Sequence, residues 1–160
     1  MRGLTNDVRL FVAVVSAQAP GLTTVQELQT EAVLLTTAIA LADGSLSRSE
    51  KRSLRSLVQE LDDPTLESTI NNDSSWAREY LVTPSDVFLR MVDADIEDFG
   101  GIGSRATTYI RAAVNLANSA AATKPENSDY VEAIIALMEN SLVKAETSRY
   151  MDRSHDHAMR

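Results

Sequence analysis

Apolar residues along this 160-residue chain recur three and four positions apart in each strongly patterned segment. Between residues 54 and 61, for example, Leu54, Leu57, Val58 and Leu61 fall at i, i+3, i+4 and i+7, which is one face of an α-helix. No segment shows the sustained alternation of apolar and polar residues that is typical of a half-buried strand. The pattern therefore predicts an all-α protein, a single compact bundle of about six to eight helices.

Turn and capping residues divide the chain into these helices. The first is expected from Thr5 or Asn6 to about Ala17, before Pro20-Gly21. The others are expected over these intervals: Thr24 to Gly44, Ser47 to Asp62, Asp63 to about Ile70, Trp76 to Leu81, Thr83 to about Ala94, Ser104 to Ala117, and Ser128 to Ala145. Residues 1–148 then form one helical domain. Residues 149–160 have little to bury and are expected to be a flexible tail.

Composition fits an ordinary soluble globular protein, with 44% apolar and 24% charged residues. Cysteine is absent, which excludes disulfides, thiolate nucleophiles and cysteine-based zinc sites and agrees with a cytoplasmic location. The apolar run 10–15 imitates a signal peptide, but Asp7 and Arg9 interrupt the region, so a buried first helix is the better interpretation. No transmembrane segment is expected, because no stretch approaches the ~20 apolar residues that cross a bilayer.

The formal net charge of −8 argues against nonspecific nucleic-acid binding, because such a surface repels phosphate. Lys51, Arg52 and Arg55 form only a small basic group, which we interpret as the solvated side of a helix. The acidity suits a cation or a basic partner instead.

The junction between the second and third predicted helices carries the main candidate site. Asp43-Gly44 forms the turn and Glu50 follows seven positions after the aspartate. In one interpretation these residues only cap the next helix, with Ser47 and Glu50 as a capping box. In the other, Asp43 and Glu50 bind a divalent cation, and the Ser45 hydroxyl or the Leu46 carbonyl adds oxygens. Calcium takes ~6–8 oxygens, so such a site would be single and weak.

The same junction, AIALADGSLSRSEK at residues 38–51, resembles the repeat motif of the tellurite-resistance TerB-like family. That family has two such motifs in an all-helical domain, and residues 116–127 offer a degenerate second copy. There Ala120 stands at the Asp, Ala121 at the Gly and Asn127 at the Glu. The resemblance implies a non-catalytic module that docks a protein partner in a stress-response or membrane-associated system.

Two alternatives stay open, a carboxylate-dependent enzyme and a purely structural interaction domain without metal. The acidic cluster 93–98 begins like an EF-hand loop, but Asp98 stands where the loop needs Gly and Ser104 where it needs Glu. We therefore expect a solvated helix end there. His155 and His157 lie in the predicted tail, which is a poor place for a catalytic imidazole. Neither the partner nor the oligomeric state follows from the sequence.

Overall fold

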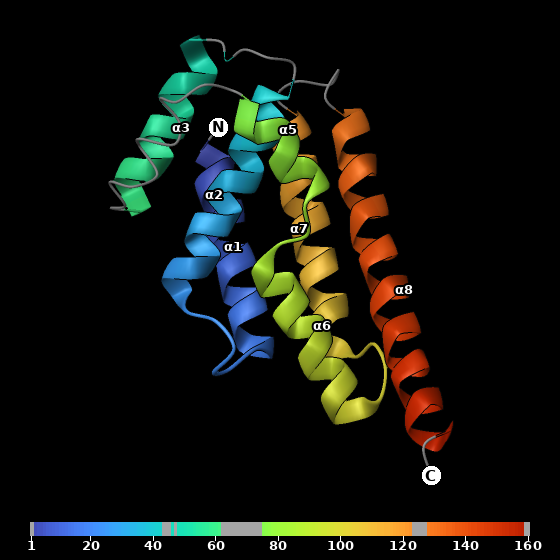
Figure 1. The fold of residues 1–160 in the computed structure, drawn as a ribbon. Helices are drawn as coiled ribbons and strands as arrows, with labels where there is room; N and C mark the ends of the chain where they lie inside the picture. The colour runs from blue at the N-terminus through green and yellow to red at the C-terminus, as the bar shows by residue number, and fades with distance from the viewer. Residues whose placement is uncertain (1, 43–45, 47, 62–74, 123–127, 159–160) are drawn as a thin grey trace.

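The computed structural model describes residues 2–42, 46, 48–61, 75–122 and 128–158, and these residues form helices and short connections without a strand (Figure 1). This confirms the all-α prediction. The described helices are α1 (Arg2–Gln18), α2 (Val25–Leu41), α3 (Arg48–Leu61), α5 (Ser75–Val82), α6 (Asp86–Phe99), α7 (Ser104–Ala122) and α8 (Ser128–Ala158). None of these helices is both long and apolar enough to cross a membrane.

Helix α2 lies at the centre of the bundle and packs against α1, α5 and α7. Its residues from Leu35 to Leu41 are all buried, as the apolar pattern on more than one face predicts. Helices α6 and α8 pack on α7 along its other sides, and α3 lies at the edge of the bundle (Figure 1). An aromatic cluster joins three of the helices, with the Tyr109 ring 5.7 Å from that of Phe11 and 5.1 Å from that of Phe88.

The ends of α2 are held by specific hydrogen bonds. The predicted capping box at its start is confirmed, because the Glu27 amide donates to the Thr24 hydroxyl (3.1 Å) and the Thr24 amide donates to the Glu27 carboxylate (3.3 Å). At the other end, the Tyr130 hydroxyl of α8 donates to the Ala42 carbonyl at 3.0 Å. The start of α8 is thereby tied to the carboxyl end of α2.

The junction between α6 and α7 differs from the prediction. Helix α6 continues past Ala94 to Phe99 and ends at Gly100, whose φ of 77° is left-handed. The expectation of a solvated helix end is wrong for Asp95, which is fully buried. Its carboxylate accepts hydrogen bonds from the Gly103 and Ala106 amides, both at 2.9 Å. Asp95 thus caps α7 from the preceding helix.

Glycine at position 103 allows this arrangement. A Cβ atom there would lie 2.7 Å from the Phe99 ring and 3.1 Å from the Asp95 carboxylate, too close for an ordinary contact. Since glycine also has no side chain to cap α7, the Asp95 carboxylate takes that role.

Other helix boundaries shift by a few residues. Helix α1 begins at Arg2, before the predicted caps, and α6 is capped by Ser85 rather than Thr83. Helix α7 continues to Ala122. The backbone of α8 is helical as far as Ala158, so it passes the predicted boundary at residue 148, while the flexibility of the tail stays a prediction. The short helix expected to end near Ile70 lies outside the described residues.

We predict that Asp95→Ala lowers the free energy of unfolding by about 2 to 4 kcal/mol, because the buried Ala106 amide and the partly buried Gly103 amide lose their acceptor. Asp98→Ala is the matched control. Its carboxylate is half exposed and pairs with Arg105 at 2.7 Å, so its loss should cost under about 1 kcal/mol. Urea unfolding followed by circular dichroism measures both. Equal losses in the two variants would contradict the capping role of Asp95.

Candidate functional site

The structure describes two of the four residues predicted to ligate a cation. Asp43 and Ser45 lie outside the described residues. Leu46 is partly buried against the core, and Glu50 lies buried in the first turn of α3 with 6% exposure. No group of three or more potential metal ligands comes together within the described part of the chain. The cation site at Asp43 and Glu50 therefore stays a prediction.

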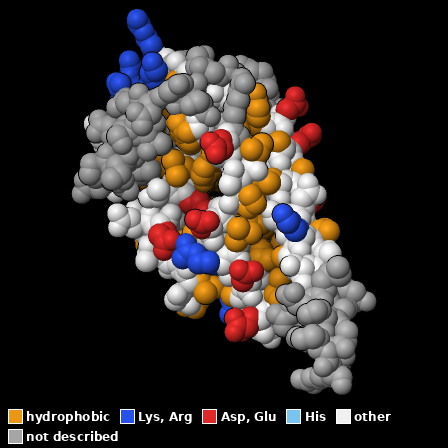
Figure 2. Space-filling view, viewed as in Figure 1, with side chains coloured by type: hydrophobic (Ala, Val, Ile, Leu, Met, Phe, Trp, Pro, Cys, Tyr) orange, Lys and Arg blue, Asp and Glu red, His pale blue; other side chains and the backbone are white. Residues whose placement is uncertain are grey.

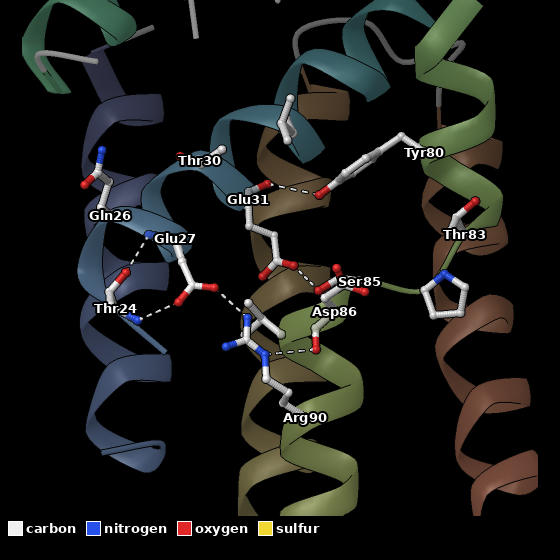
Figure 3. Close-up of a pocket in the computed structure, with 13 residues that line it drawn as sticks. Thr24, Gln26, Glu27, Thr30, Glu31, Tyr80, Thr83, Ser85, Asp86 and Arg90 are labelled. Atoms are coloured by element: carbon white, nitrogen blue, oxygen red, sulfur yellow. Dashed lines mark hydrogen bonds and ion pairs between the residues drawn. The ribbon is translucent and has the colours of Figure 1, made fainter. Parts of the chain in front are cut away.

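A different site emerges between α2 and α6. A pocket of about 500 Å³ opens where the start of α2, the end of α5 and the 83–85 connection meet α6 (Figure 3). We call it the Glu31 pocket. It is lined by Thr24, Gln26, Glu27, Thr30, Glu31, Leu34, Tyr80, Thr83, Pro84, Ser85, Asp86, Val87 and Arg90.

Glu31 is the buried acidic residue of this pocket, with only 9% of its surface exposed. The Ser85 hydroxyl donates to Oε1 of Glu31, and the same hydroxyl accepts from the Phe88 amide at 3.1 Å. The residue that caps α6 therefore also binds the Glu31 carboxyl group on α2. The Tyr80 hydroxyl donates to the Glu31 backbone carbonyl at 3.3 Å.

The second carboxyl oxygen of Glu31, Oε2, is buried and has no hydrogen-bond partner among the described residues. Figure 3 shows this oxygen turned away from Ser85, toward the side of the pocket that Glu27 and Arg90 line. A buried carboxylate oxygen normally accepts hydrogen bonds, and leaving it without a donor is unfavourable. Because this oxygen has almost no accessible surface, a donor from the pocket would reach it only if neighbouring side chains moved.

Burial also changes the acidity of this group. It raises the pKa of Glu31 to about 7, although the Tyr109 hydroxyl and the Arg90 charge act in the opposite direction. Burial likewise raises the pKa of Tyr109, and the negative charge of Glu31 adds to that effect. Glu31 thus changes its charge near neutral pH, where a glutamate in water would be fully ionised.

Arg90 forms one rim of the pocket and ties α6 to the start of α2. Its Nη2 lies 2.5 Å from the Glu27 carboxylate, and its Nη1 donates to the Leu22 carbonyl at 2.8 Å. The Arg90 charge is therefore committed to Glu27. The two other carboxylates of the pocket, those of Glu31 and Asp86, form no ion pair with described residues.

The charge of the pocket consequently favours a positive ligand. Three carboxylates face a single guanidinium in its lining. On the face of the molecule drawn in Figure 2, several acidic side chains surround one basic side chain, whereas the basic side chains at the upper left have no acidic neighbour in this view. A cationic group entering the pocket would meet the Glu31 carboxylate where water is largely excluded, which strengthens the attraction.

Sequence reasoning missed this site, although one signal was present. Glu31 interrupts the apolar run of α2, between Leu28 and Ala32-Val33, on the side that the pattern assigns to the core. A charged residue on a buried face demands a partner. The identity of that partner could not be read, because Ser85 lies 54 positions away in the chain.

Comparison of the chain with models of protein families, with curated proteins and with solved structures gave no match. The resemblance to the TerB-like family, which depends on residues 38–51, stays a prediction.

We predict that Glu31 makes the protein less stable as the pH rises. Its pKa is about 7 in the folded chain and 4.5 ordinarily, so the folded state holds a proton that the unfolded state releases between these values. This stabilising contribution is complete below pH 4.5 and is lost as the pH rises through 7. The loss amounts to about 3 kcal/mol for a shift of this size.

Glu31→Gln removes the titration and keeps the shape. Unfolding in urea measures the free energy of unfolding of this variant and of the wild type from pH 4.5 to 8. Over this range the variant should gain about 3 kcal/mol of stability relative to the wild type. A constant difference over this range would contradict the raised pKa.

Proposed function

We propose that this chain is a non-catalytic helical binding module, of the TerB-like kind, which docks a protein partner by receiving one of its basic side chains in the Glu31 pocket. The observation that carries the proposal is the buried Oε2 of Glu31, which has no hydrogen-bond partner among the described residues, together with the place of Glu31 in the lining of the pocket. An ammonium or guanidinium group would supply the missing hydrogen bond and neutralise the charge at once.

The surroundings of Glu31 favour a cation over other ligands. An anion would meet the carboxylates of Glu27, Glu31 and Asp86, whereas Arg90 already pairs with Glu27. The chain as a whole carries a net charge of −8, which attracts a basic partner over longer distances and speeds its association. Arginine side chains are also common among the central residues that contribute most of the binding energy in protein interfaces.

A small probe tests the pocket directly. Nα-acetyl-lysine methylamide should bind the wild type and perturb amide signals around Glu31 in nuclear magnetic resonance spectra, while the Nε-acetylated compound, which has no charge, should not. Glu31→Gln should weaken binding about tenfold or more, because the charged hydrogen bond is lost. Glu97→Gln removes the same charge from an exposed position of α6 outside the pocket and should bind like the wild type.

Binding should also fall as the pH drops below about 7, because a protonated Glu31 no longer attracts the cation. Equal affinity of the Glu31→Gln variant and the wild type would overturn the assignment of this pocket. Binding of the Nε-acetylated compound with the same affinity would show that charge is not what the pocket recognises.

The turn at Asp43 remains a separate proposal, a weak calcium site formed with Glu50 and with oxygens of Ser45 and Leu46. Millimolar calcium chloride should then raise the melting temperature by about 2 to 4 °C, since a ligand that binds only the folded state stabilises it. Asp43→Ala should abolish this rise. Asp93→Ala removes an exposed carboxylate elsewhere and should keep it. A wild-type melting temperature that ignores calcium would leave capping as the only role of the turn.

One observation favours a second candidate function, a carboxylate-dependent enzyme. A glutamate whose pKa is about 7 can both accept and donate a proton at neutral pH, and the Ser85 hydroxyl lies in contact with it. Turnover in a broad hydrolase screen that disappears in Glu31→Gln would favour this candidate over the binding module.

A further inference from the structure

We propose that helix α3 carries a separate docking surface, which binds a short acidic segment of a protein partner. The surface consists of four exposed basic side chains, which we call the α3 basic stripe: Arg48, Lys51, Arg52 and Arg55. None of them lines the Glu31 pocket, and the inference does not depend on the function proposed for that pocket.

The stripe lies on one exposed side of α3. Its members follow the spacing i, i+3, i+4 and i+7, which places them together on one side of a helix. Leu54, Leu57 and Val58 are buried, so a different side of α3 faces the bundle. Helix α3 lies at the edge of the bundle (Figure 1), and the basic side chains at that end of Figure 2 have no acidic neighbour in this view. The stripe is therefore accessible to another molecule.

The charges of the stripe repel one another. Residues three and four positions apart on a helix are neighbours, so each member of the stripe has two like-charged neighbours at these spacings, which destabilises a helix. None of the four forms an ion pair among the described residues. Arg48 is also the first residue of α3, at the positive end of the helix dipole. A helix selected for stability alone would alternate the signs of its charges, whereas an acidic ligand would relieve this repulsion.

The size and composition of the stripe fit a short acidic peptide segment. Arg48 and Arg55 are seven positions apart, which is about 10 Å along a helix axis. About three residues of an extended chain span that distance. Arginine predominates in the stripe, and its guanidinium group binds a carboxylate through two parallel hydrogen bonds. Clusters of arginine recognise acidic and phosphorylated segments of proteins in this way.

Larger anionic partners fit the molecule less well. The whole chain carries −8 in spite of the stripe, so a nucleic acid that extended beyond α3 would meet an acidic surface that repels it. A helix that binds a membrane inserts an apolar face. The structure describes the whole of α3, and this helix has no exposed large apolar side chain. A short acidic peptide needs neither an apolar face nor a basic surface beyond the stripe.

Acetyl-tetraglutamate amide is a suitable probe for the stripe. At low ionic strength it should shift amide signals of α3 in nuclear magnetic resonance spectra, while acetyl-tetraglutamine amide, which has no charge, should not. Arg48→Gln combined with Arg52→Gln should weaken binding about fivefold, because two exposed charged contacts are lost. Arg9→Gln combined with Arg111→Gln removes the same charge from exposed positions of α1 and α7, so this control should bind like the wild type.

Thermal melting distinguishes a binding role of the arginines from a structural one. The chain with Arg48→Gln and Arg52→Gln should melt at the wild-type temperature or above it, because the substitutions remove repulsion. A lower melting temperature would contradict that repulsion and overturn the inference. So would tetraglutamate that binds this variant as tightly as the wild type. Vesicles containing phosphatidylserine, or a DNA duplex, that bind through the same arginines more tightly than the peptide would overturn the choice of partner.

Discussion

The hydrogen bond between Ser85 and Glu31 is the constraint on which the candidate site depends. Most residues of helix α2 are buried, and a carboxyl group in its middle is tolerated only where a donor reaches it. Ser85 meets that demand while it caps α6, so one hydroxyl group sets both the start of a helix and its position against α2. This contact satisfies only one of the two carboxyl oxygens of Glu31.

Local chemistry explains most of what the sequence predicts correctly. Thr24 and Glu27 act within one turn, so their capping box is readable from spacing alone, and the apolar pattern of α2 announces a central helix. The same reasoning fails for Asp95, because its carboxylate accepts hydrogen bonds from amides eight and eleven residues later in the chain, beyond a loop. Sequence reasoning predicts that every residue in a run of acidic residues faces solvent, and only the fold shows which of them is buried.

The candidate site could not be predicted from local sequence patterns for the same reason. Glu31, Ser85 and Arg90 come together only when α2 and α6 pack, and no spacing rule connects them. The candidate cation motif at Asp43 and Glu50 spans only eight residues of the chain and is therefore visible to sequence reasoning. A site is therefore easy to recognise in the sequence when its residues are close together in the chain. A site built from residues on different helices becomes harder to recognise as their separation in the chain grows.

The double use of Glu27 limits how the recognition properties of the Glu31 pocket can change. Its carboxylate closes the first turn of α2 and also binds Arg90, which in turn holds the Leu22 carbonyl. Replacing either residue would alter the charge of the pocket and loosen a helix start together. Gln26 and Asp86 line the same pocket, are exposed, and form no ion pair among the described residues. Ligand preference is therefore free to diverge at these two positions, by natural variation or by design, while the fold keeps its supports.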